Sequence, residues 1–399
     1  MTKAWLEQGL SAEPARPAGS QVIESADYAS ATPIELAFLS TLVDPRLLTW
    51  AIWAAGETGV SPKSTLLAEG AVSDDVYYRA LADRIGAAPF SRDLVLSSRT
   101  EIDAALRGGV AALQPNRHGL RALFAPRGEA VRELLRRSDD GDLDAATLAL
   151  CSPRRFEALV RGQFRKQIAA QAANGLTKRD PDLSADRGLS GRQRTAIAAA
   201  ACALAGLAWM TPKLTAIAAS VALWTLFLMA IGLRAVAVGA GRTPDVAAPL
   251  LDEHLPIYSV LVPLHDEADM IPQLLGALEA IDYPRAKLDV KLVLEERDLE
   301  TMRAVSDAAP PPWIDVVTIA PGAPTTKPRA LNAALASARG DLLVIYDAED
   351  IPDPAQLRAA AARFAAEPDL DCLQARLVVH NFAQSWLTRG IMAQAPQAV

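Results

Sequence analysis

The chain has 399 residues, a formal net charge of −7 at pH 7 and 51% hydrophobic residues. This length predicts two or three domains, and a negative charge without a basic stripe argues against nucleic acid as a partner. The three cysteines (Cys151, Cys202 and Cys372) lie far apart without disulfide or zinc spacing, which favours a reducing compartment.

The N-terminal part of the chain predicts a tail, a small domain and a linker. Residues 1–30 carry scattered Ser, Pro and Gly and no secretory signal, so we expect a disordered tail. Residues 31–165 show capped helical patterns and then two strand–turn–helix units, which predict an α+β domain. Residues 166–194 are mixed in composition and predict a linker.

One stretch of this domain has a family resemblance. The runs 66–75 and 80–86 resemble the N-terminal domain of type II secretion ATPases. The resemblance implies a docking or regulatory module. The Arg-Leu-Gly motif through which some members bind cyclic di-GMP is absent, since that place reads Thr58-Gly59-Val60-Ser61-Pro62-Lys63.

Residues 195–238 are almost wholly apolar, apart from an interruption at Thr211-Pro212-Lys213. A spanning helix needs about 20 apolar residues, which the second run meets and the first approaches. We therefore expect a transmembrane hairpin of two helices, with a buried hairpin in a soluble core as the alternative. Basic residues flank the pair on both sides, so both soluble regions are expected on the cytoplasmic side of a bacterial inner membrane.

The region 255–399 alternates strand-like and helical patterns. Strand-like segments at 257–264, 288–294, 313–319 and 342–346 alternate with helical segments. This alternation predicts the α/β class with a doubly wound parallel sheet. Neither a Walker A motif nor a Gly-x-Gly-x-x-Gly turn follows any strand, which argues against P-loop and dinucleotide-binding folds.

Acidic side chains follow the last of these runs. Asp347, Glu349 and Asp350 come directly after the apolar stretch 342–346. Ligands bind at the carboxyl ends of strands in open α/β sheets. Carboxylates at this spacing can hold Mg²⁺ or Mn²⁺ that bridges a substrate diphosphate, while the alternative is a solvated acidic turn.

Other charged residues complete a candidate nucleotide site. Lys327 can meet a diphosphate as a point charge. Glu295 or Glu296, after the second strand, can accept hydrogen bonds from a base or ribose, and Glu267 can do so after the first. The predicted cofactor-binding residues are Glu267, Glu295, Glu296, Lys327 and Asp347.

These motifs together resemble the family 2 inverting glycosyltransferases of GT-A fold, in the cellulose-synthase-like branch. The matching pieces are Val262-Pro263-Leu264-His265-Asp266-Glu267, 326–335, 346–357, Gln374-Ala375-Arg376-Leu377, and Asn381 with 385–389. The resemblance implies a hexosyltransferase that uses a UDP-sugar donor and a divalent cation, with inversion at the anomeric carbon. By position Asp347 and Glu349 stand for the family's Asp-x-Asp pair, with Asp350 as the alternative second ligand.

Two family motifs have no counterpart in this sequence. The Thr/Ser-Glu-Asp motif that supplies the general base is absent, and so is the acceptor-binding Gln-x-x-Arg-Trp motif. A base takes the proton of the attacking hydroxyl, so we expect little transfer and a truncated form of a longer enzyme. The expected function is polysaccharide or glycoconjugate synthesis on a glycan or lipid-linked acceptor. The alternatives are a non-catalytic, membrane-anchored nucleotide-sugar-binding or regulatory protein and a secretion-linked scaffold.

Overall fold

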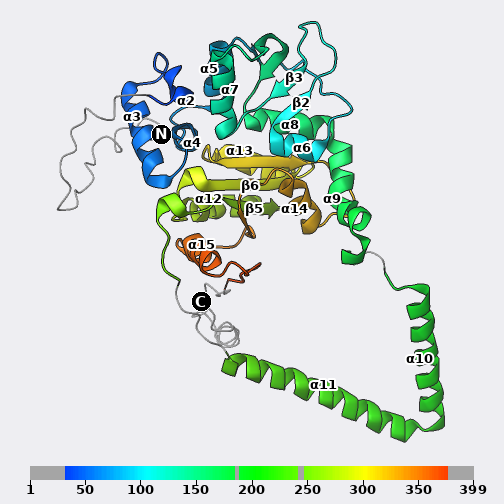
Figure 1. Cartoon of the computed structure of the whole chain (residues 1–399). Helices are drawn as coiled ribbons and strands as arrows, with labels where there is room; N and C mark the ends of the chain where they lie inside the picture. Colours follow the sequence, from blue (N-terminus) through cyan, green and yellow to red (C-terminus); the bar gives the residue numbers. More distant parts are fainter. Residues whose placement is uncertain (1–31, 185–187, 241–246, 376–399) are drawn as a thin grey trace, which may run out of the picture.

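The computed structural model describes residues 32–184, 188–240 and 247–375, with the side chains of 237–240 excepted (Figure 1). The N-terminal region, blue to cyan in the figure, stacks on the C-terminal sheet, and two helices extend from the pair as a long arm. The expected tail at 1–30 and the motif residues Arg376, Leu377, Asn381 and 385–389 lie outside the described ranges.

The N-terminal region combines helices with a small sheet. Its helices are α2 (Ile34–Ala37), α3 (Pro45–Thr58), α4 (Pro62–Ala68), α5 (Asp74–Ile85), α6 (Ile102–Gly108), α7 (Glu129–Asp139) and α8 (Pro153–Gln163). Its strands are β1 (Ala88–Pro89), β2 (Val110–Ala112), β3 (Ala122–Phe124) and β4 (Leu148–Leu150), in the order β1-β4-β3-β2. The side chains of Asp44, Ser61 and Ser73 accept backbone N–H groups at the starts of α3, α4 and α5, as their positions before Pro or Asp predict.

The segment expected to be a linker is largely helical. Helix α9 (Arg165–Arg179) continues directly from α8, and its Ile168 and Ala172 are buried. Both side chains belong to the same apolar cluster as Ala330 and Ala333 of the C-terminal region. The sequence does not predict the contact between α9 and the C-terminal region, because the buried face of α9 is made mostly of alanine and gives only a weak apolar period.

The arm consists of α10 (Gly191–Met210) and α11 (Pro212–Ala240), separated at Thr211. Only one helix among the described residues, at Pro212–Val236, is long and apolar enough to cross a membrane, and none of its most apolar window is buried. In Figure 1 α10 and α11 meet at a corner and diverge instead of lying side by side. A hairpin of two spanning helices is therefore not confirmed.

The C-terminal region has the predicted α/β architecture. Its strands are β5 (Tyr258–Leu264), β6 (Leu288–Glu295), β7 (Ile314–Ile319) and β8 (Leu342–Ile345), all parallel and in the order β7-β6-β5-β8. Its helices are α12 (Ile271–Glu279), α13 (Leu299–Ala308), α14 (Lys327–Leu335) and α15 (Gln356–Ala366). The expected parallel sheet is confirmed.

The two faces of this sheet have different partners. Val260, Val262 and Leu292 pack into one cluster with α12, α13 and α15. Leu261 and Val293, which alternate with them along the strands, pack on the opposite face with α14, α8 and α9. The N-terminal region is thus a third layer over the face that α14 covers.

Lys63 is a buried cation in the core of the N-terminal region. Its side chain is 4% exposed, and its Nζ donates to Tyr78 Oη at 3.1 Å. Tyr78 in turn donates to the carbonyl oxygen of Pro126. Burial lowers the pKa of Lys63 to about 8, although the nearby charges of Glu35 and Asp74 oppose the change.

Replacing Lys63 tests this assignment. Since the pKa of Lys63 is about 8 when folded and about 10.4 when unfolded, the unfolded chain binds more protons between these values. The free energy of unfolding should therefore rise by up to about 3 kcal/mol from pH 8 to pH 10.4. Lys63→Met should be more stable than wild type at pH 7 and should lose this rise, measured by urea unfolding of the detergent-solubilised chain. Lys166→Met, at an exposed position, is the control, and an unchanged pH slope in Lys63→Met would contradict the assignment.

Candidate functional site

The carboxyl ends of the parallel strands meet at one edge of the C-terminal sheet. Polar segments follow three of them, at 265–267 after β5, 296–298 after β6 and 347–350 after β8. The loop after β7 leads to Lys327, the first residue of α14. Residues more than 80 positions apart in the sequence therefore lie along a single edge, as the alternating pattern predicts.

Lys327 and Asp347 form an ion pair at this edge. The Nζ of Lys327 contacts Oδ1 of Asp347, and the two side chains are 44% and 52% exposed. An exposed ion pair of this kind contributes at most about 1 kcal/mol to stability. Its partners can therefore be exchanged for a phosphate and a cation at little cost.

The three carboxylates of the acidic turn after β8 differ in their contacts. Asp350 Oδ2 accepts the backbone N–H of Asp347 at 2.8 Å, and its own N–H donates to the Asp347 carbonyl at 3.1 Å. Asp350 therefore closes the turn. Ala348 is buried, whereas Asp347 and Glu349 are exposed on either side of it. This arrangement favours Asp347 and Glu349 as the pair that faces a ligand.

Glu267 faces these acids from the end of β5. Its side chain is half-buried, and its Oε2 is buried with no hydrogen-bond partner among the described residues. Burial raises the pKa of Glu267, the charges of Glu349 and Asp347 raise it further, and Lys327 and His265 oppose the change. A buried carboxylate oxygen among negative charges is stabilised by a cation or a proton. The structure thus brings together four predicted residues from three segments.

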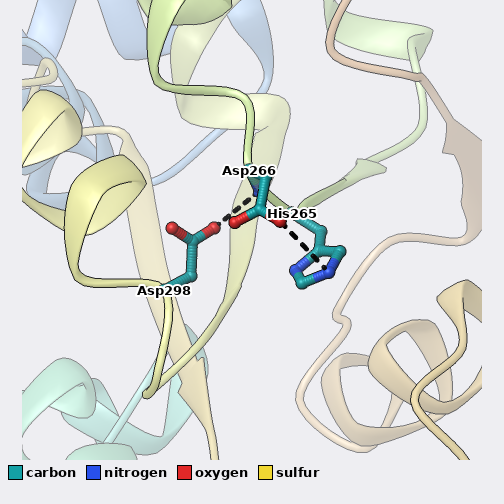
Figure 2. Close-up of side chains that lie close together, drawn as sticks. All are labelled: His265, Asp266 and Asp298. Atoms are coloured by element: carbon teal, nitrogen blue, oxygen red, sulfur yellow. Dashed lines mark hydrogen bonds and ion pairs between the residues drawn. The ribbon is translucent and has the colours of Figure 1, made fainter.

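A second acidic group is formed by the segment after β5 and the residue before α13 (Figure 2). His265, Asp266 and Asp298 place their ligand atoms within 4.8 Å of one another, the spacing that a metal ion requires. In the part of the chain that the structure describes, this is the only such group, and Asp347, Glu349 and Asp350 do not form one.

Asp298 also has a structural task in this group. Its Oδ2 accepts the backbone N–H of Asp266 at 2.8 Å, and its Oδ1 accepts that of Thr301 at 3.1 Å. Asp266 has a φ of 56°, in the left-handed region, and this bond holds it there. Burial acts to raise the pKa of Asp298, but these bonds hold it below its ordinary value. Its only sequence signal was an Asp just before a helical pattern.

The glutamates after β6 have unequal surroundings. Glu295 is 5% exposed and is held by Arg329, whose Nη2 donates to Oε1 at 2.7 Å, and by Arg297 at 2.7 Å. Its carboxylate is therefore committed to the protein, which speaks against the predicted contact with a base or ribose. Glu296 is half-buried and pairs with Arg165 of α9, so it is the member left near the surface. Arg329 was overlooked as a site residue although it stands in the Lys-Pro-Arg motif.

Comparison with known proteins identifies the region that carries this edge. Residues 256–395 match the family model described as Glycosyltransferase like family 2. The probable glycosyltransferase YdaM of Bacillus subtilis (strain 168) is 28% identical over 171 residues, 42% of this chain and 40% of that protein. The beta-monoglucosyldiacylglycerol synthase of Synechocystis sp. is 30% identical over 155 residues, 37% of this chain and 32% of that protein.

The chain spans less than half the length of these relatives. Among solved structures, a mannosyltransferase from Pyrobaculum calidifontis in complex with GDP-Man and Mn²⁺ is 28% identical, with a TM-score of 0.32 over 40% of this chain and 46% of that one. The cellulose-synthase-like branch, the likeness to secretion ATPases and the truncation stay predictions. What the comparisons support for residues 256–395 is a glycosyltransferase family 2 domain.

Proposed function

We propose that this edge binds the donor, a nucleoside diphosphate sugar with a divalent cation, for a membrane-bound inverting glycosyltransferase. The observation that carries the proposal is the ion pair of Lys327 with Asp347 at the carboxyl edge of the sheet, together with the buried, unpartnered oxygen of Glu267, whose carboxyl group senses the charges of Asp347, Glu349 and Lys327. The family match over the same residues supports it.

The oxygen atoms that these residues offer as metal ligands fit a hard cation. Asp347 and Glu349 offer exposed carboxylates, and Glu267 Oε2 is a buried oxygen without a partner among the described residues. Oxygen ligands of this kind suit Mg²⁺ or Mn²⁺. His265, Asp266 and Asp298 are the alternative ligand set, although two bonds to backbone N–H groups already occupy Asp298.

Each residue of the edge then has a defined task. Asp347 and Glu349 would hold the cation, which would supply positive charge to stabilise the diphosphate leaving group. Lys327 exchanges Asp347 for a diphosphate oxygen. Glu296 accepts a hydrogen bond from the ribose or base, while the pairs of Glu295 with Arg297 and Arg329 fix the loop that carries it. We assign no general base among the described residues.

We propose a UDP-sugar as the donor and a hexose as the group transferred to a glycan or lipid-linked acceptor. The apolar helix within α11 supports reaction at a bilayer. The name of the Synechocystis relative, beta-monoglucosyldiacylglycerol synthase, supports a lipid acceptor. From the basic residues that flank the arm and the packing of the N-terminal layer on the C-terminal sheet, we propose that both soluble regions lie on the cytoplasmic side of an inner membrane. This arrangement requires α10 to cross the bilayer together with α11.

The second candidate is a non-catalytic nucleotide-sugar-binding protein with a regulatory role. The extensive contact between the N-terminal layer and the C-terminal region favours this regulatory role. Transfer of radiolabelled sugar from a UDP-sugar to membrane lipid or glycan separates the two candidates, because the second binds the donor without product.

Removing Asp347 tests the cation site. Asp347→Ala should abolish Mn²⁺-dependent UDP binding, because it deletes a cation ligand and the partner of Lys327. Isothermal titration of the detergent-solubilised chain with UDP, with and without Mn²⁺, measures this. Asp307→Ala, at an exposed position in the last turn of α13, is the matched control. Unchanged affinity in Asp347→Ala would count against the site.

Removing Lys327 tests the diphosphate contact. Lys327→Ala should weaken UDP binding about 10- to 100-fold, since a hydrogen bond to a charged group contributes about 1.5–3 kcal/mol. UMP, which lacks the second phosphate, should bind wild type and variant alike. Titration of both nucleotides in Mn²⁺ gives the comparison, and equal losses for UMP and UDP would show that Lys327 does not meet the diphosphate.

A further inference from the structure

We propose that Arg161, a residue of the N-terminal layer, positions the donor site by fixing helix α14, and so sets the affinity for a nucleoside diphosphate. This inference rests on the proposed function, because α14 carries Lys327. It assigns the N-terminal layer a part in donor binding.

Helix α14 lies between the sheet and the N-terminal layer. Its first residue, Lys327, meets Asp347. Farther along, Ala330, Ala333 and Ala334 are buried in the cluster that also contains Ile168 and Ala172 of α9. Figure 1 shows α9 running beside α14. The small side chains on both helices allow close contact, so a shift of α9 or α8 displaces α14.

Arg161 of α8 grips the carboxyl end of α14. It is 9% exposed, its Nη1 donates to the Ala333 carbonyl at 3.0 Å, and its Nη2 donates to Ser337 Oγ at 2.8 Å. The N–H of Ser337 donates to the carbonyl of Ala334, whereas in a regular α-helix it would donate to the carbonyl of Ala333. The guanidinium of Arg161 supplies the donor that the Ala333 carbonyl would otherwise lack. The positive charge of Arg161 at the carboxyl end of α14 also interacts favourably with the helix dipole.

Two further contacts join the same parts. Asn332 of α14 donates from Nδ2 to the Ala172 carbonyl of α9 at 3.0 Å. Arg165, at the start of α9, pairs with Glu296 at the end of β6. The N-terminal layer therefore touches both α14 and the loop after β6, which together carry Lys327 and Glu296.

The layer is also bound to the sheet by charged groups. Lys291 and Asp289 are 0% and 1% exposed on the face of β6 that the layer covers. Lys291 lies 3.5 Å from Asp315, which pairs with Arg154 of α8. Removing the N-terminal layer would leave these buried charges without partners, which is strongly unfavourable. The experiment therefore uses the whole chain.

The experiment compares nucleotides in the full-length, detergent-solubilised chain with Mn²⁺. Arg161→Met should weaken UDP binding about 5-fold by isothermal titration and leave UMP binding unchanged, because it acts through Lys327. Arg161→Lys, which keeps the cation, should recover part of the loss. Arg84→Met is the matched control, since Arg84 pairs with Asp139 on the surface of the N-terminal layer, and it should stay within about 2-fold of wild type.

A double-mutant cycle separates positioning from general damage. In a Lys327→Ala background, Arg161→Met should produce no further loss of UDP affinity. Where Arg161→Met fails to fold, Ser337→Ala removes an acceptor of the same contact and carries the same expectation. An additive loss in the cycle, equal losses for UMP and UDP, or unchanged UDP affinity in Arg161→Met would overturn the inference.

The two proposals fail in different ways. If wild type binds UDP in Mn²⁺ and Arg161→Met binds it equally well, only the positioning role is lost. If wild type binds neither UDP nor GDP with Mn²⁺, the proposed function is lost and the positioning role with it.

Discussion

The parallel pairing of β8 with β5 is the constraint on which the candidate site depends. It aligns Tyr258 with Leu342 and Leu261 with Ile345, so the acidic turn after β8 lies beside the segment that follows β5. Glu267 and Glu349 are more than 80 positions apart in the sequence, and the charge of Glu349 acts on the carboxyl group of Glu267 only for this reason. A register slip of one residue would turn the half-buried face of β8, which carries Leu342 and Val344, outward and move the carboxylates away from Glu267.

The sequence predicted the sheet because strand-like segments alternate with helical patterns, and polar residues follow three of these segments. Glu267, Lys327, Asp347 and Glu349 lie along one edge, since parallel strands share it. The roles of their neighbours required coordinates. Glu295 reads as an available acid, yet Arg329, which is 34 positions away, neutralises it. Asp298 holds Asp266 in a left-handed conformation that no local pattern indicates.

The N-terminal layer was harder to place for a related physical reason. Its contacts with the C-terminal region are made by small residues of α9 and by arginines. Neither gives the wide apolar stripe of a typical packed helix. On the sheet, burial acts to raise the pKa of Asp289, but Arg339 and Lys291 hold it well below its ordinary value. A face of this kind in β6 reads from sequence as a solvated surface, and only the covering layer shows that it is buried.

The ion pairs at the carboxyl edge differ in burial, and this difference assigns their roles. Arg329 and Glu295 are 2% and 7% exposed, so separating them would leave a buried charge without its partner, which is strongly unfavourable. Lys327 and Asp347 are about half exposed, so water can replace either partner. In the proposed site, a ligand that brings a cation for Asp347 and a phosphate for Lys327 would open the second pair and leave the first intact. The buried pair would then keep the loop after β6 in place while the exposed pair exchanges its partners.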